Sequence, residues 1–296
     1  MTEAQTTARP TAGEAISLKR VLVGFDGSDG GRDALELARV VGAACGAAIT
    51  VATVVPTPPL PIRYASLEEE PSEATPLFEE ARRRLDGLEV GTQALGSDSP
   101  AMAMTLHAER EDADLVVVGS PHRGAIGRAV MGSVAHGLLH GAPCAVVVAP
   151  RGYGEERHEV IRTIAVAFDG TPESQAALEQ AEALARATRG RIRVLTVVSE
   201  VAPLPAGMFA TYPSTRPPEP DRLLTDAVNS VDPALAAEGK RLDGWPPAKL
   251  AEACEDVDLL IAGSRRYGLL ARTLLGSVST ELVHRAPCPV MVVPRP

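Results

Sequence analysis

The sequence predicts an α/β fold in which two tandem, doubly wound domains each contain a parallel sheet of five strands. Its 296 residues suffice for two domains of the usual ~150 residues. Short apolar runs alternate with segments of helical periodicity, which is typical of a parallel sheet covered by helices on both faces. Segments of the first half also return in the second half at a nearly constant spacing, which indicates a tandem duplication.

The duplication is visible in four pairs of matching segments. Each first-half segment has its counterpart 143 or 144 positions further along the chain. Four matches at nearly one spacing exclude coincidence, so we interpret the chain as two copies of one domain. The pairs are VLVGFDG (21–27) with IAVAFDG (164–170), DLVVVGS (114–120) with DLLIAGS (258–264), GSV (132–134) with GSV (276–278), and APC (142–144) with APC (286–288).

The elements follow from the apolar pattern. Positions 34, 37, 38 and 41 are apolar and recur at helical spacing, which predicts a helix that Gly42 and Gly46 close. Helices are also expected at 134–139 and 278–283, each after a glycine-serine pair. The expected strands of the first half are 20–25, 48–55, 88–95, 115–118 and 145–149, and those identified in the second half are 163–168, 191–198 and 290–293.

Proline and polar composition set the expected limits of the domains. Two proline-rich stretches, 56–76 and 201–220, are expected to be exposed loops because proline interrupts helices and central strands. The start of the chain is polar and has no apolar core of a signal peptide, which favours a short disordered tail. We predict a tail at 1–18, a first domain at 19–150, a linker at 151–160 and a second domain at 161–296.

Composition excludes several classes of function. The formal net charge of −9 argues against non-specific binding to nucleic acid, which needs a positive surface. No apolar run reaches the ~18 residues that span a bilayer, so no membrane association is expected. The four cysteines show no metal-ligand spacing, which favours a reduced, cytoplasmic setting. Cys144 and Cys288 are expected to be core thiols, and Trp245, beside two prolines, a packing residue.

Two repeated features fall where strands end and loops begin. In an open parallel sheet, ligands bind outside the carboxyl ends of the strands, where the strand order reverses. Asp26 and Asp169 directly follow the first strand of each half and precede its first helix. We interpret them as binding residues. An N-cap aspartate that accepts backbone N–H bonds is an equal alternative, and the two roles can coexist.

The second feature is the loop 119–133, with its copy at 263–277. Gly119 and Gly263 end a strand, and a glycine-serine pair precedes the next helix. Glycine permits close approach of the backbone, while the helix N-terminus attracts an anion, so Ser133 and Ser277 could either cap the helix or donate to a phosphate oxygen. An arginine-bearing surface loop with a capped helix is the alternative. The chain has no Walker motif of a P-loop.

At these residues each half resembles the universal stress protein domain. The run GSVSTELVHRAPCPVMVV (276–293) carries the most specific part of the resemblance, and its first-half copy begins at Gly132. Nucleotide-binding members of the family carry G-x2-G-x9-G-(S/T) after the fourth strand. The outer positions of that motif are present in both halves, whereas His122 and Arg266 replace the middle glycine.

The resemblance implies two domains of the adenine-nucleotide alpha hydrolase type, related by an approximate two-fold axis, with the fifth strands paired across it. It also implies ATP as ligand, with Mg²⁺ carried by the nucleotide. Base and ribose would lie beside the aspartate and a second-strand residue, and the phosphates on the glycine loop. The implied residues are Asp26, Val54, Gly119, Gly132, Ser133 and Val134 in the first half, and Asp169, Val197, Gly263, Gly276, Ser277 and Val278 in the second. His122 and Arg266 depart from the motif, and as potential cations they could pair with a phosphate oxygen in place of the glycine.

Two functions from different classes follow. The first is a cytoplasmic stress-response sensor or regulator that binds adenine nucleotide and acts through an unknown protein partner, as an internal pseudo-dimer that could itself dimerise. The second is a nucleotide-independent interaction module whose clefts are blocked by His122 and Arg266. Because neither half repeats a catalytic constellation, no enzyme and no protein-bound metal are expected, although slow ATP hydrolysis stays open.

Overall fold

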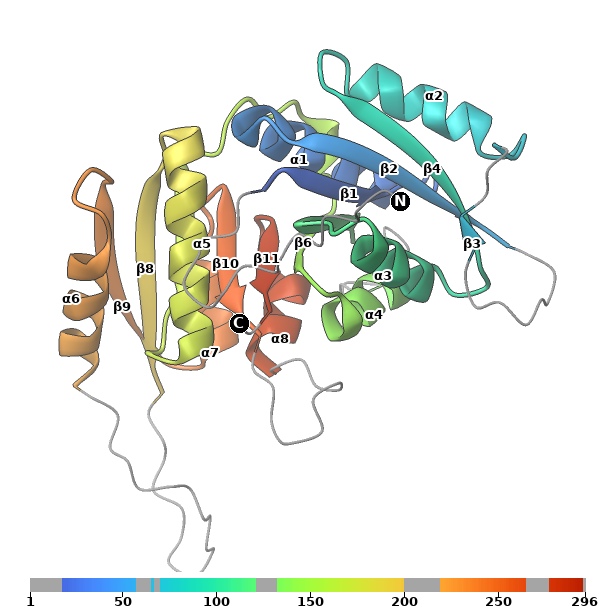
Figure 1. Cartoon of the computed structure of the whole chain (residues 1–296). Coiled ribbons are helices and arrows are strands. Elements are labelled where there is room, and N and C mark those ends of the chain that lie inside the picture. Colours follow the sequence, from blue (N-terminus) through green and yellow to red (C-terminus); the bar gives the residue numbers. More distant parts are fainter. Residues whose placement is uncertain are drawn as a thin grey trace, which may run out of the picture.

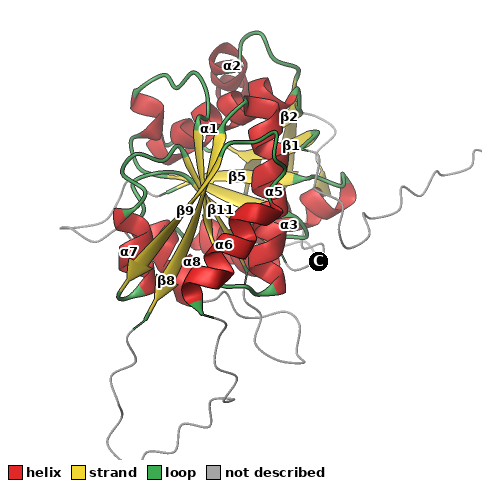
Figure 2. Ribbon diagram, turned by 90° about the vertical axis from the view of Figure 1, so that its left-hand side faces the viewer, coloured by secondary structure: helices red, strands yellow, loops and turns green. Residues whose placement is uncertain are grey.

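The computed structural model describes residues 18–56, 65–66, 70–120, 132–199, 219–264 and 277–294. In these residues one sheet of eleven strands runs through the whole molecule, with helices on both faces (Figures 1 and 2). The predicted α/β class with two tandem, mostly parallel five-stranded units is confirmed. In addition, a two-residue strand, β3 (Ala65–Ser66), pairs antiparallel with the outer strand β4 (Val90–Gly96).

Apart from β3 and the short helix η1, the two halves contain the same elements in the same order in the described residues. The first half consists of β1 (Arg20–Gly24), α1 (Asp29–Cys45), β2 (Ala48–Val55), β3, α2 (Thr75–Arg84), β4, α3 (Pro100–Arg110), β5 (Leu115–Gly119), α4 (Ser133–Gly141) and β6 (Ala145–Ala149), followed by the short 3-10 helix η1 (Tyr153–Glu155). The second half consists of β7 (Thr163–Ala167), α5 (Pro172–Thr188), β8 (Arg191–Val198), α6 (Pro220–Ser230), β9 (Ala237–Asp243), α7 (Pro246–Glu252), β10 (Leu259–Gly263), α8 (Ser277–Arg285) and β11 (Val290–Val293).

The strand order places a switch point in each half. The order across the sheet is β3-β4-β2-β1-β5-β6-β11-β10-β7-β8-β9. Val23 of β1 therefore lies between Val51 of β2 and Val117 of β5, all in parallel register. The chain winds outward from β1 in one direction and from β5 in the other, so the gap between their carboxyl ends is open to a ligand. The pair β7 and β10 repeats this arrangement in the second half.

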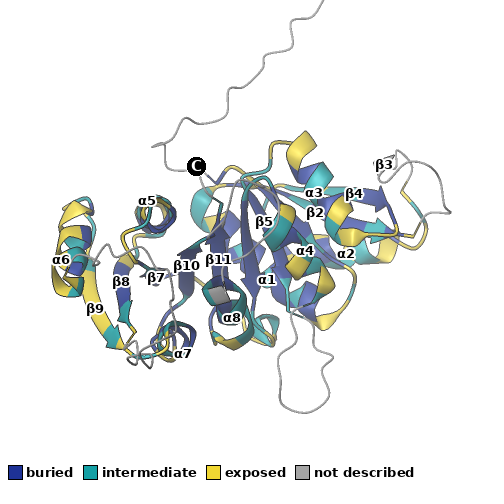
Figure 3. Cartoon of the chain, turned by 90° about the horizontal axis from the view of Figure 1, so that it is seen from below, coloured by how far each residue is buried: buried dark blue, intermediate teal, exposed yellow. Residues whose placement is uncertain are grey.

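The halves join through their last strands. β6 and β11 pair antiparallel, with Val147 opposite Met291. The second half repeats the strand order of the first in reverse from this seam, as an approximate two-fold axis between β6 and β11 requires. The predicted pairing of the fifth strands is thereby confirmed. Every residue of β6 and β11 is buried, which explains their uninterrupted Val, Ala and Met sequence (Figure 3 shows β11).

The two faces of the sheet have different cores. One continuous apolar cluster covers the face under α1, α2, α5 and α6, and it contains residues of both halves, such as Leu37 and Leu184. On the opposite face, α3 and α4 cover a first-half cluster, and α7 and α8 cover a second-half cluster. Val283 of α8 packs against both of these clusters. The halves thus share one core and meet at the edge of two others.

Several local expectations need correction. Gly42 does not close α1: it lies inside the helix, and Gly46 is the C-cap with a φ of +63°. A glycine fits at position 42 because a Cβ there would lie 2.7 Å from the Ile49 side chain. Leu18, which we placed in the tail, is buried in the core. The stretch 56–76 is not loop throughout, since it contains β3 and the start of α2. Residues 1–17 of the predicted tail lie outside the described residues. The same holds for 57–64 and 67–69 of the first proline-rich stretch and for most of the second, 201–220.

The linker packs against α1. The buried carboxylate of Asp33 accepts hydrogen bonds from the backbone N–H groups of Gly152 (3.1 Å) and Gly154 (2.6 Å). The rings of Tyr153 and His158 stack at 3.9 Å. The connection between the halves is therefore part of the shared core face. In the described part of the chain, no helix has the length and apolar character needed to cross a membrane.

Candidate functional site

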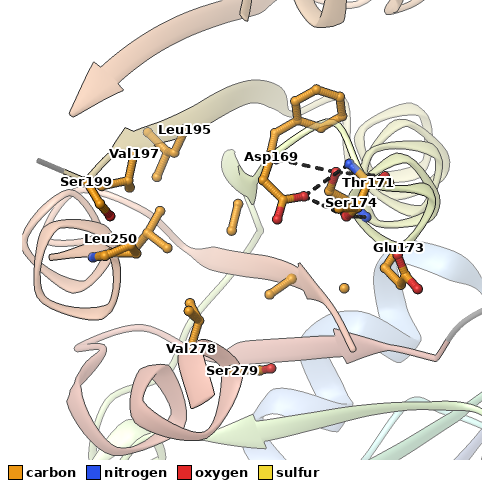
Figure 4. Close-up of a pocket in the computed structure, with 15 residues that line it drawn as sticks. Asp169, Thr171, Glu173, Ser174, Leu195, Val197, Ser199, Leu250, Val278 and Ser279 are labelled. Carbon is orange, nitrogen blue, oxygen red and sulfur yellow. Dashed lines mark hydrogen bonds between the residues drawn. The ribbon is translucent and has the colours of Figure 1, made fainter. Parts of the chain in front are cut away.

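A cleft opens at each switch point, at the carboxyl ends of β1 and β5 and of β7 and β10. The first has a volume of about 710 Å³ and the second of about 290 Å³. Figure 4 shows the second cleft. The first cleft is lined by 24–32, Ala52, Val54, Pro100, Met104, 118–120 and 132–135. The second is lined by 167–169, Thr171, Glu173, Ser174, Leu195, Val197, Ser199, Pro246, Leu250, Ala262, Gly263, Val278 and Ser279.

Asp26 lies at the mouth of the first cleft but does not cap the helix. Its Oδ1 atom accepts hydrogen bonds from the backbone N–H (3.0 Å) and the hydroxyl (2.5 Å) of Ser28. Ser28 is the N-cap of α1 and accepts from the N–H of Gly31 at 3.1 Å. The N-cap alternative for the aspartate is therefore wrong, because the capping hydroxyl sits two residues later. Asp26 orients that hydroxyl and is itself exposed.

The second half repeats this arrangement with threonine as the cap. Oδ1 of Asp169 accepts from the backbone N–H (3.1 Å) and the hydroxyl (2.6 Å) of Thr171 (Figure 4). Thr171 in turn accepts from the N–H of Ser174 at 3.3 Å as the N-cap of α5. The same local geometry has thus been kept in both copies, so the start of the first helix is held rigidly beside each cleft.

The glycine at the end of each central strand is required by packing. A Cβ on Gly119 would lie 1.7 Å from the carbonyl oxygen of Gly30 in the first turn of α1. A Cβ on Gly263 would lie 2.4 Å from the carbonyl oxygen of Glu173 in α5. The absence of a side chain lets the strand end pass under the helix N-terminus. This close approach forms the floor of each cleft, whatever the cleft binds.

The helix after the glycine loop contributes its N-terminus to the first cleft. Gly132 is the N-cap of α4, Ser133 is its first residue, and Val134 follows. Of the two roles considered for Ser133, capping is wrong, since the N-cap is Gly132 and no side chain caps the helix; Ser133 is exposed. Backbone N–H groups of the first turn have no partner within a helix, so they are suited to an anion.

The remaining predicted residues divide into two groups. Val54 lines the first cleft, and Val197 and Val278 line the second, beside the aspartates and glycines described above. α8 begins at Ser277. His122, Arg266 and Gly276 lie outside the described residues, as do the loop arginines Arg123, Arg128, Arg265 and Arg272.

Several lining residues were not found from the sequence. Met104 and Pro100 come from α3, and Leu250 and Pro246 come from α7 at matching places. Both helices begin with proline after the outer strand, a shared signal that could have identified them. Arg32 also lines the first cleft. It was not found from the sequence because Arg32 belongs to none of the repeated motifs and has no arginine counterpart in the second half.

Arg32 supplies a cation to the rim of the first cleft. Its guanidinium contacts Glu80 of α2 at 2.8 Å and Asp29 at 3.0 Å. The hydrogen bond with Arg32 lowers the pKa of Glu80, and the same bond raises the pKa of Arg32. Both groups are thus charged at neutral pH. Gln175 occupies the matching position in the second half.

The described part of both clefts lacks the groups of common hydrolytic centres. Neither described lining contains a histidine or a cysteine, so it offers no Ser–His or Cys–His pair. Among the described residues, no group of three His, Cys, Asp or Glu side chains is placed to hold a metal ion. His140 and His284 lie in the last turns of α4 and α8, where a positive charge is favoured.

Comparison with known proteins identifies the fold. The model of the universal stress protein family matches residues 17–150 and again residues 161–294. The chain belongs to the universal stress protein family. Both copies of the domain therefore carry the family signature, and together they cover most of the sequence.

Curated universal stress proteins share this tandem arrangement. One from Mycobacterium tuberculosis (strain ATCC 25618 / H37Rv) is 28% identical over 306 residues, which cover 93% of this chain and 99% of that protein. One from Mycolicibacterium smegmatis is 28% identical over 302 residues, with 92% and 96% covered. A universal stress protein of Thermus aquaticus is 29% identical over 140 residues. The match includes 99% of that protein but only 45% of this chain. That match is consistent with duplication of a single-domain form.

Solved structures show the same fold. A universal stress protein from Archaeoglobus fulgidus DSM 4304 superposes with a TM-score of 0.65 at 20% identity, covering 95% of this chain and 97% of that one. A putative universal stress protein from Pseudomonas aeruginosa UCBPP-PA14 gives 0.66 at 16% identity, covering 95% and 94%. The arrangement of both halves in one chain thus recurs in other universal stress proteins.

Proposed function

We propose that this universal stress protein is a cytoplasmic stress-response sensor or regulator that binds adenine nucleotide, ATP with its Mg²⁺, without fast turnover. The observation that carries the proposal is the first cleft. It brings Asp26, Val54, Gly119, Ser133 and Val134 from four separate segments to one edge of the sheet. Its volume of about 710 Å³ lies within the ~300–1,000 Å³ range of small-molecule sites.

The chemistry of the cleft suits the two ends of a nucleotide. Oδ1 of Asp26 is engaged by Ser28, whereas Oδ2 has no hydrogen bond to another described residue. A carboxylate oxygen accepts hydrogen bonds from ribose hydroxyls. The apolar side chains of Val54 and Met104 offer a surface for the base. The start of α4 offers backbone N–H groups and the positive end of a helix dipole to the phosphates.

Regulation fits this site better than catalysis does. The described lining holds carboxylates, hydroxyls and apolar groups but no evident general base paired with a nucleophile. A protein of this kind would signal by exchanging nucleotide and contacting a regulatory protein partner, either as the internal pseudo-dimer or as a homodimer. Slow ATP hydrolysis is compatible with that role.

Nucleotide content and affinity test the proposal. Purified protein is heat-denatured and the released ligand is identified by mass spectrometry; ATP is then titrated calorimetrically into the wild type, Asp26→Ala and Gly132→Val. We expect released adenine nucleotide and weaker binding by both variants, more so for Gly132→Val because the branched side chain fills space needed by phosphate. Asp86→Ala, at an exposed position outside both clefts, is the control and should bind as the wild type does.

Two outcomes would contradict the proposal. Unchanged affinity in a double Asp26→Ala, Asp169→Ala variant would mean that the site has been misplaced. Absence of both released nucleotide and ATP binding would favour the nucleotide-independent interaction module. His122 and Arg266, which that alternative assigns as blocking residues, would then be replaced by glycine, and binding gained by these variants would identify them as the block.

A further inference from the structure

The two clefts differ at positions that are otherwise equivalent. The backbone N–H of Phe25 donates to the carbonyl of Ala52 at 3.0 Å, and that of Phe168 donates to the carbonyl of Leu195 at 2.9 Å. Ala52 and Leu195 therefore occupy the same place relative to the end of the first strand. Each also lies two residues before the valine that lines its cleft. Their side chains point to the same side, since residues alternate along a strand.

Leucine at this position fills the second cleft. Leu195 places an isobutyl group where Ala52 has a methyl, and both residues line their clefts. Leu195 is fully buried and packs in one apolar cluster with Leu250 and Ala262 (Figure 4). A side chain held in this way by close-packed neighbours cannot swing aside without opening a void elsewhere in the core.

A second exchange involves the end of the first strand and the facing helix. A Cβ on Gly24 would lie 2.9 Å from the sulfur of Met104. In the second half, Ala167 carries that Cβ, and the shorter Leu250 stands in place of Met104. Methionine is unbranched and adapts its shape to what it contacts, whereas leucine does not. The first cleft thus has an adjustable wall and the second a fixed one.

The third exchange concerns the helix N-terminus. Gly30 of α1 has no side chain, whereas Glu173 of α5 adds one that lines the second cleft and is buried. Its backbone carbonyl and Cβ lie against Gly263 at the end of β10. The Glu173 side chain therefore adds volume at the edge of the second cleft that the first cleft does not have.

We propose, on the basis of the nucleotide-binding function above, that only the first half binds nucleotide and that Leu195 and Glu173 close the second cleft to it. The volumes agree with the exchanges, because about 290 Å³ remains in the second cleft against about 710 Å³ in the first. The duplication has then produced one binding half and one half that supports it.

Stoichiometry on the full chain tests the inference. Calorimetric titration of the wild type with ATP is expected to give one nucleotide per chain. Ala52→Leu should weaken binding about tenfold or more by overpacking the first cleft. Leu195→Ala combined with Glu173→Gly should raise the stoichiometry to two nucleotides per chain. Circular dichroism and the melting temperature show whether each variant is folded, and the second variant keeps the test decisive if Ala52→Leu does not fold.

Trp245 gives a readout specific to the second half. It is the only tryptophan of the chain, it is 53% exposed, and it adjoins Pro246, which lines the second cleft. ATP should leave its emission unchanged in the wild type and alter it in the Leu195→Ala, Glu173→Gly variant. That variant is compared with Leu195→Ala alone to separate the contributions of Leu195 and Glu173.

Each outcome distinguishes the inference from the function on which it rests. Two nucleotides per wild-type chain would overturn the inference and leave nucleotide binding intact. One nucleotide per chain that is lost in Asp169→Ala but kept in Asp26→Ala and Ala52→Leu would place the site in the second half and also overturn it. No binding by either the wild type or the opened variant would overturn the proposed function together with the inference.

Discussion

At the residue scale, Gly119 shows that one residue can serve the fold and the cleft at once. We predict that Gly119→Ala lowers the free energy of unfolding by ~1–3 kcal/mol or more, since the added Cβ would lie 1.7 Å from the Gly30 carbonyl oxygen and α1 must move. Denaturant titration followed by circular dichroism measures the loss. The displaced helix would also disturb the Ser28 cap and the position of Asp26 beside it.

The matched control is another strand glycine with room around it. At Gly91 in β4, the nearest atom to an added Cβ is the Thr50 hydroxyl oxygen at 3.7 Å, an ordinary contact. Gly91→Ala should therefore be close to neutral. Equal destabilisation by both substitutions would mean that the loss at position 119 comes from strand propensity and not from the contact with α1.

A second residue-scale prediction concerns thiol chemistry. Burial raises the pKa of Cys144 to about 12 and that of Cys45 to about 11, both above the ordinary value of 9.0. Folding then favours the protonated thiols. Their contribution to stability is fully present below pH 9 and is lost as the pH rises towards 11–12. We expect Cys144→Ala to lose less stability than the wild type between pH 9 and 11 in denaturant titrations.

Alkylation checks the same thiols independently. Because thiolate is the reacting form, native Cys144 should react with iodoacetamide at pH 8 much more slowly than the same residue in denaturant. Equal rates in the native and denatured protein would contradict the burial of this thiol. The residue Cys144 is half-buried and packs at the edge of the first-half cluster, whereas Cys288 is buried within the second-half cluster. The prediction that both cysteines are core thiols therefore fits Cys288 better than Cys144.

The sequence predicts motif residues well and their neighbours poorly. Asp26, Gly119 and Val134 line one cleft, because the first two lie at the ends of neighbouring strands and Val134 begins the helix that follows β5. It could not predict that Ser28 caps α1, since a carboxylate and a hydroxyl two residues apart are both good caps. The prediction that Trp245 is a packing residue was wrong. Trp245 is exposed, and the Cζ atom of Arg285 lies over its ring, 5.2 Å from the ring centroid.

At the element scale, α1 holds the linker through buried charged groups. Glu36 accepts hydrogen bonds from the Arg39 guanidinium at 2.7 Å and from the backbone N–H of His158 at 2.8 Å. Burial by itself would raise the pKa of Glu36, but these hydrogen bonds outweigh it and the pKa is lowered. The stabilisation is therefore present above the ordinary carboxyl pKa of 4.5 and is lost as the pH falls below it.

Glu36→Gln tests this contact. It should lower the free energy of unfolding at pH 7 by ~1.5–3 kcal/mol, the usual range for hydrogen bonds to a charged group. The difference from the wild type should be smaller at pH 4, because below the ordinary pKa of 4.5 the carboxylate of the unfolded chain is protonated before that of the folded protein. Denaturant titration at both pH values provides the measurement. Glu79→Gln, at an exposed position on α2, should show neither effect, and a pH-independent difference at Glu36 would argue against a charged contact.

The linker also shows where element prediction from sequence stops. Strands β2, β6, β8 and β11 lie where their apolar runs predict, because a strand buried on both faces leaves a continuous signal. The polar residues of the linker carry no such signal. Their structure depends on Asp33 and Glu36, about 120 positions earlier in the chain. The local periodicity of a sequence cannot predict such a contact, because the loop and the helix face are far apart in the chain.

At the scale of the whole molecule, the sheet is continuous through the centre and protected at its outer edge. β9, the last strand, is largely exposed and carries Glu238, Lys240, Arg241 and Asp243. Charged side chains on an edge strand oppose further strand pairing. The apolar strands β6 and β11 instead cover each other. Association of whole chains is therefore expected to use helix or cleft surfaces and not extension of the sheet.

This continuity predicts that the halves unfold together. Leu95 of β4 is fully buried near the first-half end of the sheet, so Leu95→Ala should cost ~2–5 kcal/mol. The only tryptophan, Trp245, lies in the second half. In the wild type, the transitions followed by Trp245 fluorescence and by far-UV circular dichroism should coincide, since one cluster of buried side chains spans both halves. In Leu95→Ala, both should shift to lower denaturant by the same amount.

Met102→Ala is the matched control, because Met102 is an apolar first-half residue that is 40% exposed on α3. It should leave both transitions nearly unchanged. In Leu95→Ala, circular dichroism could show a first transition at lower denaturant while the midpoint of the Trp245 transition is unchanged. That result would mean that the halves unfold independently. The β6–β11 seam and the shared core under α1 and α5 would then be too weak to couple them, and a ligand bound in the first half could not stabilise the second. Coincident shifts would instead mean that the halves unfold as one unit, so that a ligand bound only by the first half would stabilise the whole chain, as the proposed sensor with one binding half requires.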